Sequence, residues 1–152
     1  MNPIGALHEE IVARLTEWSM KIAPKKRVRV RVQSSIGLVE QESAPEPDLA
    51  WVVRRDYSGG RPTEADVLLV VEVAESSLAY DCGEKADLYA AAGIADYWVV
   101  NLPDHSIEVR RDPEKGRYRS LSTCRERQEV RPLAEPEAIL LPASLWGEAE
   151  KG

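Results

Sequence analysis

The segment 67–74, VLLVVEVA, constrains the fold most, because it is apolar on both faces of a strand except at one position. A strand with two apolar faces is typical of the centre of a sheet that is covered from both sides. Glu72 interrupts the run, and an ionised carboxylate in such a place is costly to bury without a partner. The sequence therefore predicts a central strand at 67–74 and a second charged group beside Glu72.

Three patterns before this segment predict a helix and two strands. Apolar residues spaced three and four apart predict a helix over roughly 4–22. Its apolar stripe consists of Ile4, Leu7, Ile11, Leu15, Trp18 and Ile22. The alternation in KKRVRVRVQ predicts a strand near 27–32 with valines on one face and arginines on the other. The short apolar segment 48–53 predicts another strand, and Asp48 is its first residue.

The patterns after the central strand predict one more helix and an antiparallel meander. Asp81 and Glu84 have the spacing of a helix N-cap and its third helical residue, and Gly93 is placed to end a helix over roughly 82–92. DYWVV reads as a buried strand. DHSIEVRR, GRYRSLST and ERQEVR alternate polar and apolar residues around turns, and EAILLPASLW predicts a last short strand and a helical turn. The expected fold is α/β of the mixed α+β kind, one domain over 1–152 with a central mixed sheet flanked by helices.

Composition narrows the function classes. The net charge of −6 argues against a broad basic surface for nucleic acid, although it leaves room for a local basic patch. With no long apolar segment and no basic leader, a cytoplasmic protein with no membrane association is expected. Cys82 and Cys124 have neither disulfide nor metal-site spacing. The two histidines, His8 and His105, occur in unrelated contexts, so neither a histidine zinc site nor a serine triad is expected.

Lys85 is the best candidate for the partner of Glu72. At helical spacing it shares a stripe with Leu88 and Tyr89, the face expected to pack on the sheet. Because it lies in the first turn of a helix that follows the central strand, its ammonium group can reach back toward Glu72. Asp48 becomes a third member if its strand is a neighbour. Two carboxylates suit Mg²⁺ or Mn²⁺, and a lysine beside them can orient or deprotonate a water, the minimum for phosphodiester hydrolysis.

These same residues carry a family resemblance. Pro47-Asp48, the VEV of 71–73 and GEKADLYAAAGIADYWVV of 83–100 resemble the Uma2 (DUF820) family, assigned to the PD-(D/E)xK restriction-endonuclease-like superfamily. The resemblance implies a restriction-endonuclease-like fold, metal ligation by Asp48, Glu72 and the carbonyl of Val73, and cleavage of DNA with Mg²⁺ or Mn²⁺. The superfamily lysine stands two positions after the strand acid, where this chain has Ala74. The resemblance transfers that role to Lys85.

Several of these side chains also have structural readings. Glu72 and Lys85 can form a structural pair, or Lys85 can extend its ammonium group to solvent. Glu9 and Glu10 can add a metal contact or simply face solvent. The ridge of Arg27, Arg29 and Arg31 can bind the phosphates of nucleic acid or form a solvated strand face. Tyr89, Tyr97 and Trp98 can stack on bases or pack in the core, and core packing is the prediction.

The function predicted from the sequence is a Mg²⁺- or Mn²⁺-dependent endodeoxyribonuclease, with Asp48, Glu72 and Lys85 as catalytic residues. The alternative is a catalytically inactive nuclease fold that binds nucleic acid or protein. A homodimer is expected, because two copies would join two arginine ridges and the chain is small for an enzyme that cuts both strands.

Overall fold

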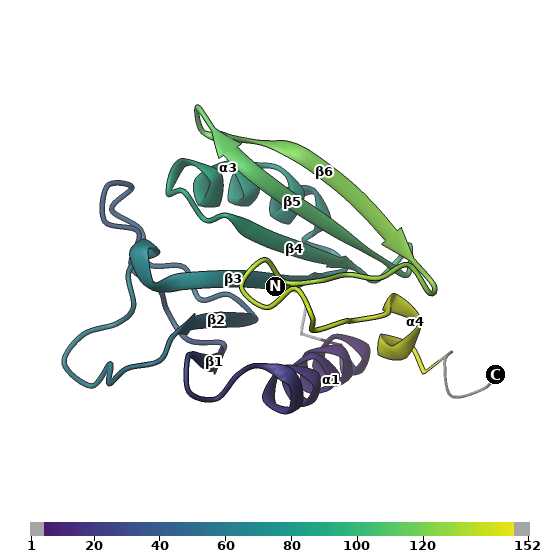
Figure 1. The fold of residues 1–152 in the computed structure, drawn as a ribbon. Coiled ribbons are helices and arrows are strands. Elements are labelled where there is room, and N and C mark those ends of the chain that lie inside the picture. Colours follow the sequence, from purple (N-terminus) through teal and green to yellow (C-terminus); the bar gives the residue numbers. More distant parts are fainter. Residues whose placement is uncertain (1–4, 148–152) are drawn as a thin grey trace.

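The computed structural model describes residues 5–147 and is built around one six-stranded sheet (Figure 1). The strands lie in chain order, and all neighbours are antiparallel except β3 and β4, which are parallel. The strands are β1 (Val28–Val32), β2 (Leu49–Val53), β3 (Val67–Ala74), β4 (Asp96–Asn101), β5 (Ser106–Glu114) and β6 (Arg117–Arg125). The helices are α1 (Ala6–Ile22), α2 (Leu78–Cys82), α3 (Glu84–Ala91) and α4 (Pro142–Leu145), with a 3₁₀ turn at Glu64–Asp66.

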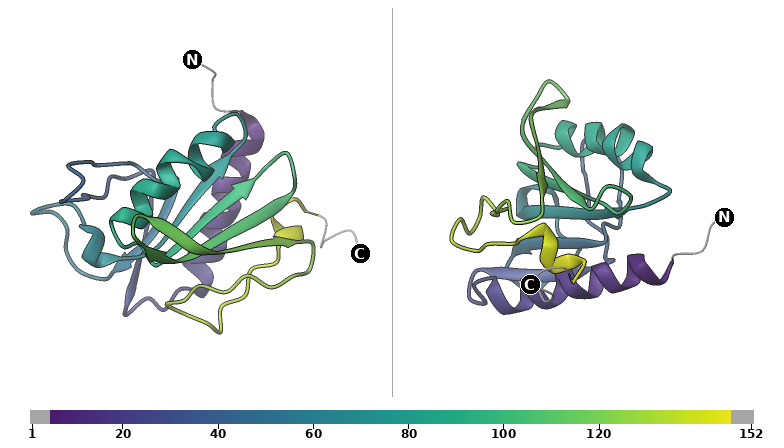
Figure 2. Two further views of the ribbon diagram at one scale, coloured as in Figure 1. Left: turned by 90° about the horizontal axis from the view of Figure 1, so that it is seen from above. Right: turned by 90° about the vertical axis from the view of Figure 1, so that its right-hand side faces the viewer.

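Helices cover both faces of the sheet, so the expected mixed sheet flanked by helices is confirmed. Figure 2 shows α1 on one face and α3 on the other, with α4 on the same side as α1. Along β3, Val71 and Val73 pack toward α1, whereas Val70 and Ala74 pack toward α3. The central position of β3 explains its two apolar faces, and Glu72 points to the α3 side because it alternates with Val71 and Val73.

Helix α1 confirms the predicted helix, but its buried face is rotated from the predicted stripe. Ile11 and Leu15 are buried as expected, whereas Leu7 and Ile22 are 44% and 39% exposed. Ser19 is fully buried instead, because its hydroxyl accepts a hydrogen bond of 2.9 Å from the indole of Trp51. Ile4 of the predicted stripe lies outside the described residues.

The helix predicted over 82–92 is wrong at its start. The chain is already helical at Leu78–Cys82, and Gly83 separates α2 from α3. A side chain at Gly83 would place its Cβ 2.8 Å from the carbonyl oxygen of Ala79, so the break depends on a glycine there. Asp81 is therefore not an N-cap, and its carboxylate instead accepts a hydrogen bond from Ser77. The predicted end is right, because Gly93 follows α3 with φ of 79°.

The buried strand predicted at DYWVV is β4, and the first two strands of the predicted meander are β5 and β6, whereas the later segments depart from the prediction. ERQEVR forms no third meander strand; only Val130 makes an isolated bridge, with Leu140. EAILLPASLW forms only the Leu140 side of that bridge instead of the predicted short strand, and then α4, the predicted helical turn. Both cysteines are free. In the described part of the chain, no helix has the length and apolar character needed to cross a membrane.

Candidate active site

Asp48 and Glu72 are held side by side where β2 begins next to β3. The antiparallel register pairs Leu49 with Val71, so the residue before Leu49 lies beside Glu72. The backbone N–H of Asp48 donates to Glu72 Oε1 at 3.1 Å. In return, the N–H of Val73 donates to Asp48 Oδ2 at 2.8 Å. These two bonds across the strand pair fix both carboxylates at one end of the sheet.

Lys85 is the partner that the apolar strand required for Glu72. Its Nζ lies 2.6 Å from Glu72 Oε2, and the side chains are 17% and 4% exposed. Tyr89, one helical turn later, donates its hydroxyl to the same oxygen at 2.9 Å. The ammonium group is therefore turned inward to the carboxylate rather than extended to solvent.

Burial changes the pKa values of both Glu72 and Lys85. Removal from water raises the pKa of Glu72 to about 7, and the charge of Asp48 adds to that shift while Lys85 opposes it. Burial works to lower the pKa of Lys85, but the charge and hydrogen bond of Glu72, together with Asp81, hold it above its ordinary value. Glu72 therefore binds its proton more tightly than an ordinary glutamate, while the opposite charge of Glu72 favours the charged form of Lys85.

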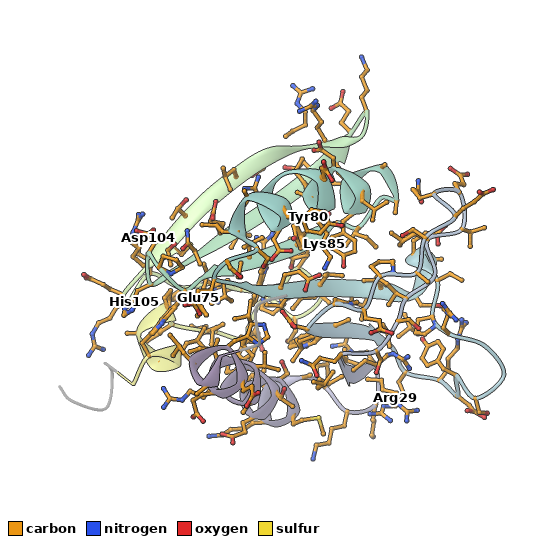
Figure 3. The ribbon with its side chains drawn as sticks, turned by 180° about the vertical axis from the view of Figure 1, so that it is seen from behind. Arg29, Glu75, Tyr80, Lys85, Asp104 and His105 are labelled. Carbon is orange, nitrogen blue, oxygen red and sulfur yellow. The ribbon has the colours of Figure 1, made fainter. Side chains whose placement is uncertain are left out.

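A cleft of about 520 Å³ opens over these residues. Asp48, Glu72 and Lys85 all line it, as do Glu75 and Tyr80. Figure 3 shows Lys85 and Tyr80 projecting from the α2–α3 pair beside β3, with Glu75, the residue that follows that strand, to one side of them. The three residues predicted from the sequence therefore converge in one cleft.

Three further residues contact this group, and the sequence reasoning did not assign them to it. Asp81 Oδ1 lies 4.0 Å from Lys85 Nζ, and burial raises the pKa of Asp81. Their spacing of four residues in the sequence was a usable signal, although a break at Gly83 puts them on two helices. The hydroxyl of Tyr89 binds Glu72, although the residue was correctly placed in the core. His8 Nε2 lies 3.3 Å from Asp48 Oδ2, a contact between distant segments for which the sequence carries no signal.

The oxygen donors of the cleft fit a hard divalent cation. Within residues 5–147, no group of three or more His, Cys, Asp and Glu side chains could hold a metal ion. The side-chain ligands would therefore be the two carboxylates of Asp48 and Glu72. Val73 directs its N–H to Asp48, and a strand residue points its carbonyl to the same side as its N–H, so that carbonyl also faces Asp48. Two carboxylates and a carbonyl, completed by water, are a ligand set that Mg²⁺ accepts.

Glu9 and Glu10, the other acids considered as metal contacts, do not line this cleft. Glu9 is exposed and borders a separate hollow between α1 and β1. Glu10 pairs with Arg14 on the surface of α1, with 2.8 Å between Oε2 and Nε. The structure thus leaves them on the solvated side of the helix.

The arginines of the predicted ridge have different surroundings in the structure. Arg27 lies before β1 and pairs with Glu135 at 2.8 Å. Arg31 instead lies over the ring of Tyr57, with 5.6 Å from its Cζ to the ring centroid, and Arg55 lies 4.9 Å from the same ring. Arg29 projects from β1, and Figure 3 shows it well apart from Lys85. Arg29, Arg31, Arg55 and Tyr57 form what we call the arginine patch.

Comparisons with known proteins find similarity in sequence and in fold. A family model named Uma2 and described as "Putative restriction endonuclease" matches residues 1–144. A crystal structure of a "putative nuclease belonging to DUF820" from Anabaena variabilis superposes with a TM-score of 0.70 at 13% sequence identity, covering 97% of this chain and 84% of that one. At that identity the superposition establishes the fold alone. No curated protein matches.

Proposed function

The chain belongs to the Uma2 family, and we propose that its cleft hydrolyses phosphodiester bonds of DNA in the presence of Mg²⁺ or Mn²⁺. The observation that carries this proposal is the buried pair of Glu72 and Lys85 next to Asp48. A buried ion pair contributes little net stability, so an acid and a lysine inserted into an apolar interior call for a chemical role. Their position on a cleft rather than in a sealed core supports that role.

Each residue of the trio has a distinct task in the proposed reaction. Asp48 and Glu72 hold the cation, with the carbonyl of Val73 as a further oxygen ligand. The bound cation supplies a Lewis acid for the phosphate and for the water that attacks it. Lys85 neutralises charge beside Glu72 and orients the attacking water toward phosphorus. Tyr89 and Asp81 keep the Glu72 and Lys85 side chains in place through the contacts at 2.9 Å and 4.0 Å.

The arginine patch is the proposed contact for the nucleic-acid backbone. Among its titratable residues the cleft has five carboxylates, Glu46, Asp48, Glu72, Glu75 and Asp81. A phosphate backbone is repelled by such a cleft and needs positive charge elsewhere on the same side of the sheet. Arg29 and Arg31 extend from the face of β1 opposite the buried Val28, the same side of the sheet as Glu72. The proposal therefore assigns Arg29 and Arg31, rather than Arg27, to phosphate binding.

Cleavage assays with purified protein test the proposal. Supercoiled DNA, linear DNA and RNA are incubated with Mg²⁺, with Mn²⁺ and with EDTA, using wild type and Glu72→Gln. Wild type should cut DNA only with a metal, and Glu72→Gln should lose at least about 100-fold, since losing a partner of a metal ligand already costs about 10–100-fold. Glu75→Gln is the matched control, because it removes a charge from the same cleft without touching the trio.

The outcomes distinguish the proposal from its rival. Equal cleavage by wild type and Glu72→Gln would identify a contaminating nuclease. Absence of cleavage with every metal, together with salt-sensitive DNA binding, would favour the catalytically inactive binding module.

We also infer a homodimer, since two copies would bring two arginine patches to one duplex. β1 and β6 are the edge strands of the sheet, and Val32 at the β1 edge is 38% exposed. Light scattering coupled to size-exclusion chromatography tests this, and a mass near 17 kDa would contradict it.

A further inference from the structure

His8 links the first helix to the proposed metal site. It lies near the start of α1, and its Nε2 is 3.3 Å from Asp48 Oδ2. Its side chain is 13% exposed and lines the cleft. The contact joins residues forty positions apart, so it forms only when α1 packs on the sheet.

The environment of the ring indicates which nitrogen carries the hydrogen. Nδ1 of His8 is buried and has no hydrogen-bond partner within the described residues. A hydrogen on Nδ1 would be a buried N–H without an acceptor, whereas a hydrogen on Nε2 would face a carboxylate oxygen and leave only a lone pair on Nδ1. The unpaired N–H costs more free energy than the unpaired lone pair. The favoured form has its hydrogen on Nε2, the nitrogen that lies 3.3 Å from Asp48 Oδ2, and leaves the buried Nδ1 as a bare lone pair.

The Asp48 carboxylate is thereby held through one of its two oxygens. Oδ2 accepts from the backbone N–H of Val73 at 2.8 Å and contacts His8 Nε2 at 3.3 Å. A carboxylate oxygen that accepts one backbone hydrogen bond and also contacts a ring nitrogen is restrained from two sides, which limits the directions open to the other oxygen. Contacts from residues behind the ligands orient the ligands of metal sites and raise the metal affinity.

We propose that His8 is a positioning residue that holds Asp48 in the orientation needed to bind a divalent cation beside Glu72. The inference rests on the proposed function, since it concerns the same site. The competing explanation is that His8 merely attaches α1 to the sheet. That role predicts a loss of stability on substitution with no change in the metal affinity of the folded protein.

Calorimetric titration of the metal-free protein with Mn²⁺ separates these roles without an activity assay. His8→Leu keeps the bulk of the ring but has no donor, whereas His8→Gln places an amide N–H near the position of Nε2. Glu9→Gln is the matched control, because Glu9 neighbours His8 on α1 but borders a different hollow. Circular dichroism and urea denaturation establish that each variant is folded under the titration conditions.

The expected result is that His8→Leu weakens Mn²⁺ binding about 10–100-fold, the range for partners of metal ligands, while His8→Gln restores most of it and Glu9→Gln has no effect. Unchanged affinity in folded His8→Leu would overturn the inference and leave His8 a structural contact. Equal weakening in His8→Leu and His8→Gln would also overturn it, since a donor alone would then not suffice. Failure of wild type to bind Mn²⁺ at all would refute the proposed function, and this inference with it.

Discussion

Lys85 Nζ lies 2.6 Å from Glu72 Oε2, and this pair joins the first turn of α3 to the centre of the sheet. The contact accounts for two unusual positions in the sequence, an acid in an apolar strand and a lysine on the buried face of a helix. It also sets the electrostatic properties of the cleft, because each charge is partly removed from water.

Lys85→Met should destabilise the protein more at pH 8 than at pH 5. At pH 8 the substitution leaves a buried carboxylate without its counter-charge, for which we expect a loss of about 3 kcal/mol. At pH 5 Glu72 is protonated and needs no counter-charge, so the loss should be smaller. Urea denaturation at both pH values measures the difference, with the exposed Lys26→Met as control. Equal losses at the two pH values would contradict this assignment of charge.

Glu72 should make the protein less stable as the pH rises from 4.5 to 7. Its pKa is raised from 4.5 to about 7 in the folded state, so the folded state binds the proton more tightly than the unfolded state. The stabilisation from this proton is complete below pH 4.5 and is lost as the pH passes 7. The expected loss is about 3 kcal/mol, at about 1.36 kcal/mol per pKa unit.

Glu72→Gln isolates this contribution, because glutamine does not titrate. Free energies of unfolding measured between pH 4 and 8 should decline less steeply with pH in the variant than in wild type. Parallel curves would mean that other groups account for the pH dependence.

Tyr89→Phe should cost about 1.5–3 kcal/mol at pH 8, the range for a hydrogen bond to a charged group. The hydroxyl of Tyr89 donates to Glu72 Oε2, so its contribution should fall at pH 5, where that carboxyl is neutral. Tyr118→Phe is the matched control, because Tyr118 donates to the neutral carbonyl of Ile94 at 2.7 Å. Its cost should be the same at both pH values. A pH-independent cost for Tyr89→Phe would contradict an ionised Glu72 at pH 8.

Arg29→Gln and Arg31→Gln should weaken DNA binding and make it less dependent on salt. Each arginine that contacts a phosphate contributes about one to the slope of log affinity against log salt concentration. Arg27→Gln should leave the slope unchanged, because Arg27 pairs with Glu135 instead. Fluorescence anisotropy with labelled DNA in EDTA measures binding without cleavage. The arginine patch would be refuted if all three variants behaved as wild type.

Gly83→Ala should destabilise the protein by about 1–3 kcal/mol, as for other substitutions that overpack a tight site. The new Cβ would lie 2.8 Å from the carbonyl oxygen of Ala79, so α2 and α3 must shift relative to each other. Lys85 lies two residues later, so Mn²⁺ affinity should fall as well. Gly59→Ala is the control, because nothing lies within 4 Å of its added Cβ. Equal stability of the two variants, measured by thermal unfolding, would show that the helix break does not need a glycine.

The sequence alone determined the features that arise from neighbours along the chain. Periodicity predicted α1 and β3, because a repeated apolar spacing produces one buried face whatever the helix or strand packs against. The position of Glu72 in an apolar strand and that of Lys85 on an apolar helix face also predicted their pairing, since each needed an opposite charge nearby.

The tertiary structure alone decided the contacts between segments far apart in sequence. Nothing near His8 indicates that α1 brings it to Asp48, and nothing near Ser19 indicates that it accepts the indole N–H of Trp51. The rotation of the buried face of α1 and the separation of Arg27 from Arg31 likewise depend on which side chains meet across the fold. A local pattern specifies which face of an element is buried on average, but a hydrogen bond of 3 Å depends on packing angle and register, which the whole chain sets together.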